Sequence, residues 1–318
     1  MKRINSIKSY IFLLFGLFSP SFMLAQADTI KIGMFVNDLF DLNLSDRSFN
    51  ADFWLWFNYQ DSTLHPMENI ELPNAKSYDA DLAFMEEKEG ILWATKKIQA
   101  AFKKDWNITN FPFDIQMLEI KVEESDKDIS DLVYLADLEN TKYYENISVS
   151  NWDIIDFGIK TAAVQYPTTY GDPTLSGSST YARATVFFKL KRKSLGLFFT
   201  LFTGVYVAFF ISVLVFFIDP IYVDPRFGLS VGGLFAAVGN KYIVDSILPQ
   251  STAFTLADKI HVMTYFFLLV CIIISVISLR IWKNGNEQKS KRLDRISFYA
   301  VTSLFVLLNL IFILQVSP

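Results

Sequence analysis

The chain has 318 residues, 52% of them hydrophobic, with a mean hydropathy of +0.28 and a net charge of −4. This composition is too apolar for an ordinary soluble protein, and the apolar excess lies mainly in the last third of the chain. We therefore expect a water-soluble N-terminal part followed by a membrane-embedded C-terminal part, and no binding of nucleic acid.

Residues 1–27 have the order of features that is typical of a secretory signal peptide. A basic start precedes the apolar run YIFLLFGLF, and small residues surround Ala25 and Ala27. This order predicts export of the segment that follows, with the mature chain beginning near Gln26 or Asp28. An uncleaved membrane anchor is the alternative interpretation.

Residues 28–193 alternate short apolar runs with turn residues, which predicts an all-β domain. In the run 48–59, Trp54 and Trp56 point to one side while Phe53 and its alternate neighbours point to the other. Both faces are therefore apolar, as in a strand of a β-sandwich. The runs that we predict as strands are TIKIGMFVNDL, SFNADFWLWFNY, MLEIKVEE, VSNWDIIDFGIK and TYARATVFFKLK.

The exported part has no catalytic constellation and no metal-ligand spacing. His65 is isolated, and the sequence contains neither a nucleophile motif nor a phosphate-binding loop. The carboxylates from Glu123 to Asp128 are typical of a solvated loop. We therefore predict neither an enzyme nor a bound metal or cofactor. The single cysteine, Cys271, lies in an apolar helix, so the exported domain must be stable without disulfides.

One loop of the exported part carries exposed aromatic residues on a turn. Phe111, Pro112 and Phe113 follow one another there, and such side chains normally need a surface to bury against. That surface is either the core of the same domain or the membrane part.

Residues 194–318 are expected to form four membrane crossings, of which the second is the most polar. The connection between the third and fourth crossings is basic, which places it in the cytoplasm by the positive-inside rule. This orientation predicts a multi-pass protein of the inner (plasma) membrane with its N-terminal domain outside or in the periplasm. The crossings are Leu195–Ile218, Asp224–Pro249, Leu256–Trp282 and Ile296–Val316.

The second crossing contains polar side chains that hydrocarbon disfavours. Asn240, Lys241 and Asp245 should therefore face protein, a partner helix or water. Several copies of this helix around one axis would enclose a water-filled path. Gly228-x-x-x-Gly232 is equally typical of close helix packing, which is the alternative. Residues that share one helical face are Asp224, Gly228, Gly232, Phe235, Gly239, Tyr242 and Ser246.

Several motifs follow one another in an order that is typical of one family. They are Trp54, Tyr59 and Asp61; Phe111 to Asp114 with Gln116; Leu248-Pro249; and Thr255 with Asp258. With these motifs the chain resembles the pentameric ligand-gated ion channels, specifically the prokaryotic branch of the Cys-loop receptor family, over nearly the whole mature chain. The resemblance implies an all-β extracellular or periplasmic sandwich followed by an all-α four-helix transmembrane domain, assembled as a homopentamer.

The resemblance also implies roles for the motif residues. Pro112, Phe113 and Asp114 would contact the linker that begins at Leu248 and Pro249, and Arg192 would pair near Asp114. Movement of the sandwich would then pass to the second crossing. The pore would be lined by the shared face, with Phe235 as the central apolar gate.

The family's ligand-site pattern is only half kept. Trp54 matches the aromatic of the complementary face, and Tyr166, Tyr170 and Tyr181 flank a hairpin that would cap the ligand. Ser125 stands where the principal face has its central aromatic, which argues against an ammonium ligand. Protons, divalent cations and another small molecule remain open as ligands.

Three function hypotheses follow. The first is an ion channel that is surrounded by membrane lipid. The carboxylates of Asp219, Asp224 and Asp245 favour conduction of inorganic cations. The positive charge of Arg226 and the pairing of Lys241 with Asp245 argue against a cation preference. The second is a non-conducting membrane-anchored receptor or scaffold of the same fold. The third is a membrane enzyme, whose only nearby ionisable pair is His261 and Asp258.

Overall fold

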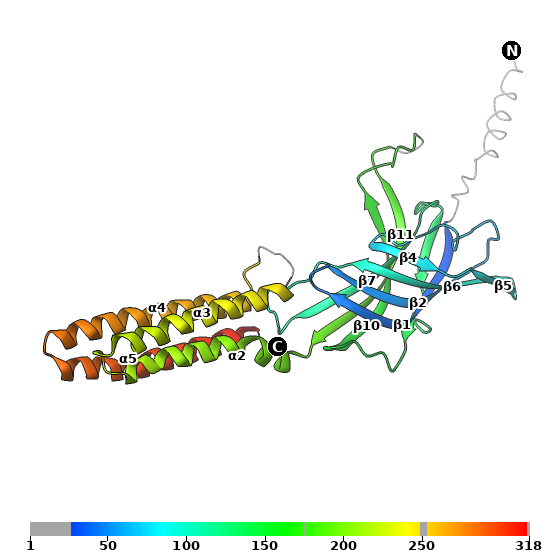
Figure 1. The fold of residues 1–318 in the computed structure, drawn as a ribbon. Helices are drawn as coiled ribbons and strands as arrows, with labels where there is room; N and C mark the ends of the chain where they lie inside the picture. Colours follow the sequence, from blue (N-terminus) through cyan, green and yellow to red (C-terminus); the bar gives the residue numbers. More distant parts are fainter. Residues whose placement is uncertain (1–26, 174–175, 249–252, 317–318) are drawn as a thin grey trace, which may run out of the picture.

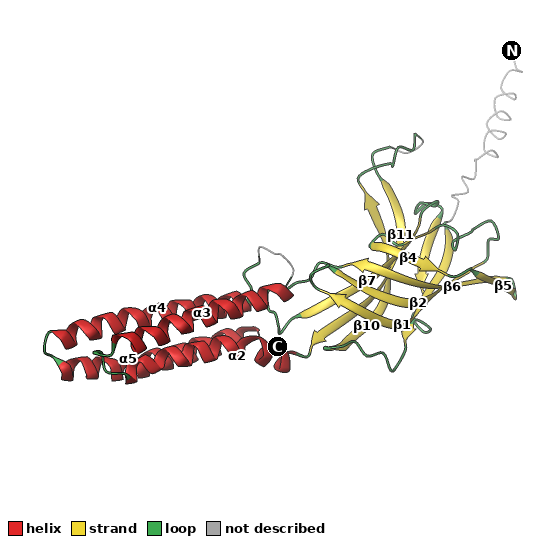
Figure 2. Cartoon of the chain, in the orientation of Figure 1, coloured by secondary structure: helices red, strands yellow, loops and turns green. Residues whose placement is uncertain are grey.

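The computed structural model describes residues 27–173, 176–248 and 253–316. A region of two β-sheets is followed by four long helices that run side by side (Figures 1 and 2). This confirms the predicted fold class of a β-sandwich domain followed by a four-helix membrane domain. The predicted signal peptide and Pro249 lie outside the described residues, apart from Ala27 at the end of the predicted leader.

The larger sheet has seven strands in the order β4-β6-β2-β1-β8, with β5 paired to β6 and β9 paired to β1. The smaller sheet has four strands in the order β10-β11-β7-β3. The five predicted strands correspond to β1, β2, β7, β10 and β11. The strands are β1 (Asp28–Asn43), β2 (Ser48–Tyr59), β3 (Ile70–Glu71), β4 (Ala75–Ala80), β5 (Phe84–Lys88), β6 (Ile91–Lys103), β7 (Ile115–Glu124), β8 (Leu132–Ala136), β9 (Lys142–Tyr143), β10 (Trp152–Tyr166) and β11 (Ser179–Arg192).

Strand β6 is long and central, although it is not among the five predicted strands. It pairs antiparallel with β2 from Tyr59↔Leu92 to Ser48↔Lys103. Its inward positions include Ala94 and Ala100, both buried, and alanine is only weakly hydrophobic. The period of two that marks a half-buried strand is therefore faint in this stretch.

The two faces of β2 have different surroundings. Phe53, Leu55 and Phe57 are fully buried in the core between the sheets, whereas Trp54 is 41% exposed. Trp56 lies against Gly33 of β1, whose backbone leaves no room for a Cβ atom. The inner face thus forms the core, while the outer face carries aromatic side chains on the surface.

Asp137 holds the edge of this sheet through several polar contacts. Its carboxylate accepts hydrogen bonds from Trp56 Nε1 at 3.2 Å and Asn140 Nδ2 at 3.0 Å, and Lys31 Nζ lies 3.0 Å away. Burial raises the pKa of Asp137, but these partners together lower it further, so its pKa lies below the ordinary value.

The helices are α2 (Ser194–Val213), which continues as the 3₁₀-helix η1 (Leu214–Phe217), and then α3 (Val223–Ile247), α4 (Leu256–Lys283) and α5 (Glu287–Val316). All four are long and apolar enough to cross a membrane. Helix α4 begins with a capping box in which Thr255 and Asp258 bond to each other's backbone N–H. The turn between α4 and α5 lies at the end of the bundle far from the sheets (Figure 1).

Helix α5 begins at Glu287, before the predicted start of the fourth crossing at Ile296. The basic stretch from Lys289 to Arg295 is therefore helical, and the connection is only residues 284–286. Lysine and arginine are good helix formers, so the helix extends beyond its apolar part. Apolar length alone marks the membrane-spanning part of such a helix and not its end.

Candidate functional site

All seven residues predicted to line a pore lie on the exposed side of α3. Arg226, Ser230, Gly233, Ala237 and Val244, on the opposite side, are buried against the other helices. On the exposed side, 70% of Phe235 and 75% of Tyr242 are accessible. We call the exposed set the α3 stripe; it consists of Asp224, Gly228, Gly232, Phe235, Gly239, Tyr242 and Ser246.

The glycines of the α3 stripe do not mediate packing within the chain. A Cβ atom added at Gly228, Gly232 or Gly239 would meet no atom within 4 Å. Close packing of α3 on α2 occurs instead at Gly233, where a Cβ would lie 2.8 Å from the backbone oxygen of Ala208. The Gly228-x-x-x-Gly232 motif is thus not used for packing within the chain.

The polar groups near the C-terminal end of α3 have partners on the chain's own helices. Asn240 Nδ2 donates to Leu201 O at 3.0 Å, and Asn240 Oδ1 lies 3.0 Å from His261 Nε2. Lys241 pairs with Asp258 at 2.9 Å and also with Asp245. Asn240 and Lys241 thus have partners on other helices of the chain, as expected, while Asp245 pairs with Lys241 but keeps 51% of its side chain exposed.

The ionisable pair that a membrane enzyme would need is engaged elsewhere. His261 is fully buried, and its Nδ1 lies 2.8 Å from Ala257 O while its Nε2 faces Asn240. Asp258 Oδ2 accepts from the backbone N–H and the hydroxyl of Thr255 at 2.8 and 2.7 Å. Each group therefore has its own structural partners.

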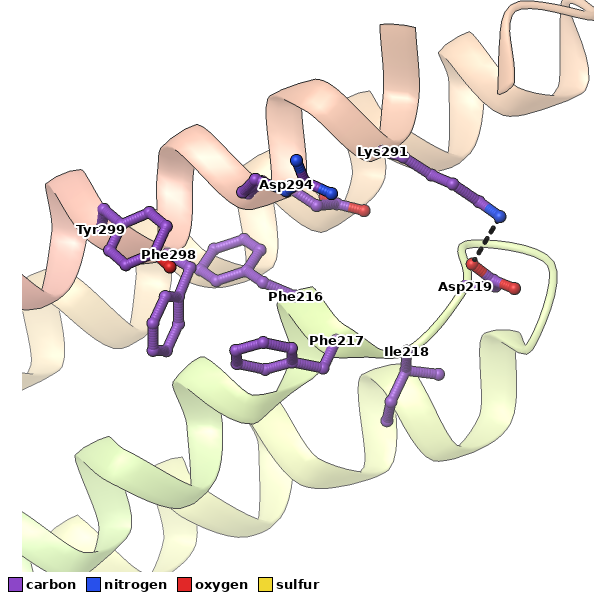
Figure 3. A pocket seen from close by; sticks show the side chains of 9 residues that line it. Phe216, Phe217, Ile218, Asp219, Lys291, Asp294, Phe298 and Tyr299 are labelled. Carbon is purple, nitrogen blue, oxygen red and sulfur yellow. Dashed lines mark ion pairs between the residues drawn. The ribbon is translucent and has the colours of Figure 1, made fainter. Parts of the chain in front are cut away.

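The structure changes the charge balance at the N-terminal end of α3. Arg226, which counted against cation entry, is fully buried and donates to Asp294 at 2.7 and 3.0 Å and to Ile218 O at 2.9 Å. Asp219 pairs with Lys291 at 3.4 Å (Figure 3). In the described part of the chain, Asp224 is then the one carboxylate on the α3 stripe, and it has no ion pair. Sequence reasoning missed Asp294, since it lies far along the chain.

The β-sheet region meets the helices through the Phe111–Asp114 loop. Phe111 is buried in the domain's own core, whereas the Phe113 ring lies 5.6 Å from that of Phe198 on α2. The backbone N–H of Leu256, at the start of α4, donates to Thr109 O at 3.1 Å. Both surfaces considered for this loop are therefore used, each by a different phenylalanine. Pro112 is buried beside them, and Leu248 is half-buried at the end of α3.

Asp114 and Arg192 form a buried ion pair at this junction. Arg192 Nε and Nη2 donate to the two carboxylate oxygens of Asp114 at 2.6 and 3.0 Å, and Gln116 Nε2 donates at 2.6 Å. The guanidinium carbon lies 3.9 Å from the centre of the Trp152 ring. This bidentate, stacked geometry suits arginine and not lysine. Trp152 and the role of Gln116 were missed, since only the fold brings them to Arg192.

Three tyrosines gather at the hairpin between β10 and β11. The rings of Tyr166, Tyr170 and Tyr181 lie 5.8 to 6.4 Å apart in edge-to-face arrangements. Tyr166 donates to Glu123 at 3.0 Å, and Arg183 pairs with the same carboxylate. Burial and the bond to Glu123 raise the pKa of Tyr166. These contacts form an aromatic cluster over a buried ion pair.

The interpretation of the Glu123 to Asp128 carboxylates as a solvated loop is wrong for the first two. Glu123 and Glu124 are only 2% and 3% exposed, because β7 continues through both residues. Glu124 accepts from Asn69 Nδ2 and the Asp126 backbone N–H, both at 3.0 Å. Short-range composition cannot distinguish a buried, paired carboxylate from a solvated one.

Of the other two predicted ligand-site residues, Trp54 lies on the other sheet from the tyrosine cluster, whereas Ser125 directly follows β7, the strand whose Glu123 bonds to Tyr166. Trp54 belongs to the larger sheet and has no ring contact with the three tyrosines. Ser125 is exposed, and its hydroxyl donates to Asn69 O at 3.2 Å. A single chain therefore carries the tyrosines and Trp54 on different sheets.

Over the described ranges, no group of three His, Cys, Asp or Glu side chains is arranged to hold a metal ion. Cys271 is buried in the helix bundle. No family model and no curated protein matches this chain.

Proposed function

We propose that this chain is one subunit of a homopentameric, ligand-gated, cation-conducting channel of the inner membrane. The observation that carries the proposal is the α3 stripe, which leaves acidic, small and aromatic side chains unpacked on a membrane helix. Asp224 lies in the first turn of α3, so five copies around one axis would set a ring of carboxylates at one mouth of a water-filled path and the glycines and Phe235 along its wall.

The proposed gate is a ring of Phe235 side chains. In each subunit the phenyl group projects from α3 with glycines one turn before and one turn after it, at Gly232 and Gly239. The ring would thus be the narrowest apolar point of the stripe. Such a ring closes a pore by excluding water and not by filling the space.

The proposed route from ligand to gate runs through the junction of sheets and helices. The Asp114–Arg192 pair joins the loop after β6 to the end of β11, directly before α2. The contacts of Phe113 with Phe198 and of Thr109 with Leu256 join the same loop to α2 and α4. Movement of the sandwich would pass through these contacts to the linker that begins at Leu248, and so to α3.

The proposed ligand site lies between subunits. The tyrosine cluster would form one wall and Trp54 of the neighbouring copy the other, since the two lie on different sheets of one chain. Protons, a divalent cation and another small molecule are the ligand classes to be tested. The sandwich would lie outside the membrane or in the periplasm, with lipid around the helices.

A non-conducting receptor or scaffold of the same fold is the second candidate. It is favoured by the open glycines Gly228 and Gly232, which would also let α3 helices of neighbouring copies pack tightly together. In that arrangement the axis would contain no water. Conductance separates the two candidates.

Phe235→Ala tests the proposal in planar bilayers that contain the purified full-length protein. We expect a ligand-independent leak current, because the substitution removes the apolar constriction. The subunit itself should stay folded, because 70% of the Phe235 side chain is exposed and makes few contacts within its chain.

Val238→Ala is the matched control. Val238 is on the same helix but off the α3 stripe, so its truncation should produce no leak. The scaffold would be favoured if neither wild type nor Phe235→Ala conducted current across pH and ligand screens while projection images showed five subunits. Images of a single subunit would contradict both candidates.

A further inference from the structure

A cavity of about 320 Å³ opens on the surface of the sandwich where β6 ends beside β7. Its wall along β7 is fixed by Asn74, whose side-chain amide donates to Glu119 O at 2.7 Å and accepts from the Lys121 backbone N–H at 3.2 Å. The space far exceeds the roughly 30 Å³ that one water molecule occupies in the liquid, so it has room for a small ion together with water. The lining residues used below are Asn74, Lys103, Lys104, Asp105, Glu119 and Lys121.

Both carboxylates on the wall of this cavity already have cationic partners. Glu119 lies 3.1 Å from Lys121 Nζ and 3.7 Å from Lys160 Nζ. Burial raises the pKa of Glu119, but its lysine neighbours outweigh this effect, so the pKa lies below its ordinary value. Asp105 lies 3.9 Å from Arg47 and is almost fully exposed to water, where an ion pair contributes little. Neither carboxylate is therefore left over to neutralise a further cation.

The ammonium groups of Lys103 and Lys104 have no carboxylate within ion-pair distance among the residues that the structure describes. Lys104 Nζ donates to the backbone oxygen of Asp105 at 2.7 Å and lies 5.8 Å from the centre of the Trp106 ring. Burial lowers the pKa of Lys104, and the attraction of Glu119 and Asp105 offsets this only in part. An anion in the cavity would stabilise the charged form of Lys104 and so offset the cost of its burial.

We propose that this cavity binds a small divalent oxyanion, such as sulfate or hydrogen phosphate, between the ammonium groups of Lys103 and Lys104. The two unpaired positive charges match the charge of such an ion, whereas chloride would neutralise only one of them. Each ammonium group offers three N–H donors, and hydrogen bonds between charged partners are about twice as strong as neutral ones. Lysine binds these ions as a compact point charge, which needs no fixed geometry in a half-open cavity.

The proposed anion site is connected to the junction of sheets and helices by aromatic rings. Trp106, beside Lys104, stacks on Trp152 with 6.1 Å between ring centres, and the Trp152 ring lies 3.9 Å from the guanidinium carbon of Arg192. Arg192 in turn pairs with Asp114. An anion held by Lys104 would thus act on the proposed route to the gate, and it would regulate the current. This regulatory role rests on the proposed function, whereas the binding does not.

The test follows the tryptophan fluorescence of the full-length protein in detergent while sodium sulfate, divalent sodium phosphate or sodium chloride is added at equal ionic strength. Trp106 lies beside the site, so we expect sulfate or phosphate, but not chloride, to give a saturable change. Lys104→Gln should weaken this binding by about tenfold or more, because it removes a charge-assisted hydrogen bond. Lys104→Arg should keep most of the affinity. Lys142→Gln is the control, because β9 is separated from β6 by β1 and β2.

A change that follows ionic strength whichever salt is added would overturn the proposal, because it would show general screening of charge. Equal affinities in Lys104→Gln and Lys142→Gln would also overturn it. If Lys104→Gln does not fold, Lys103→Gln still decides, because its side chain is exposed and its loss should weaken binding without unfolding the sandwich. The titration needs neither a membrane nor a current, so its failure is independent of channel activity. A current that sulfate alters equally in wild type and Lys104→Gln would refute the regulatory role.

Discussion

Replacing Asp114 with asparagine leaves the Arg192 guanidinium buried without a counter-charge. Both residues are less than a tenth exposed, and two hydrogen bonds of 2.6 and 3.0 Å join them. The Trp152 ring at 3.9 Å holds the guanidinium in place, so Arg192 is not free to turn toward water. We therefore expect Asp114→Asn to destabilise the β-sheet region strongly.

The expected cost follows from burial. Removing one partner of a buried ion pair costs about 3–5 kcal/mol, whereas an exposed pair contributes about 0–1 kcal/mol. For a domain of this size class, about 1 kcal/mol corresponds to roughly 2–4 °C in melting temperature. Asp114→Asn should thus lower the melting temperature by on the order of 10 °C. The double variant Asp114→Asn/Arg192→Gln should recover part of this loss, because no unpaired charge remains.

The neighbouring pair Lys193–Asp153 provides the matched control. Its atoms lie 3.3 Å apart, and both side chains are 58% exposed. Lys193→Gln should therefore shift the melting temperature by only a few degrees. Tryptophan fluorescence during thermal unfolding of the detergent-solubilised protein is a suitable readout, because Trp152 stacks on the affected guanidinium.

Similar small shifts for Asp114→Asn and Lys193→Gln would refute this reasoning. A double variant that loses as much as the sum of its single variants would refute the coupling between Asp114 and Arg192. Either result would mean that the junction is held by the surrounding aromatic contacts and not by the ion pair.

Two further substitutions test the packing of the helices and the edge of the larger sheet. Gly233→Ala should lower the melting temperature, because its Cβ would collide with Ser212 of α2. Gly232→Ala is the control and should leave the melting temperature unchanged, because the space around Gly232 is open. Equal effects of the two substitutions would contradict the assigned faces of α3. Asp137→Asn should remove the acid-dependent part of the stability of the sheet edge. Because the folded-state pKa of Asp137 is depressed, its stabilisation is present above the ordinary value of about 3.9 and lost as pH falls through the folded pKa, so the wild type and the variant should converge in strong acid.

The amino-acid sequence by itself determined the features that depend on neighbours along the chain. The period of two in β1, β2, β7, β10 and β11 and the apolar length of four helices follow from local patterning. The α3 stripe also does, because spacing at three and four residues places side chains on one helical face in any helix. The sequence also distinguishes α3 from the other three long helices, because its mean hydropathy is the lowest of the four.

Only the tertiary structure decided which groups are buried and with which partners. Arg226 meets Asp294 across a separation of 68 residues, and Asn240 meets His261 on another helix. The sequence offered Gly228 and Gly232 as positions of close helix packing, but the structure places that packing at Gly233, because the bundle covers that side of α3. Glu123 is buried by strands from distant parts of the chain. Such pairings depend on burial and contact in three dimensions, which the spacing of residues along the chain does not specify.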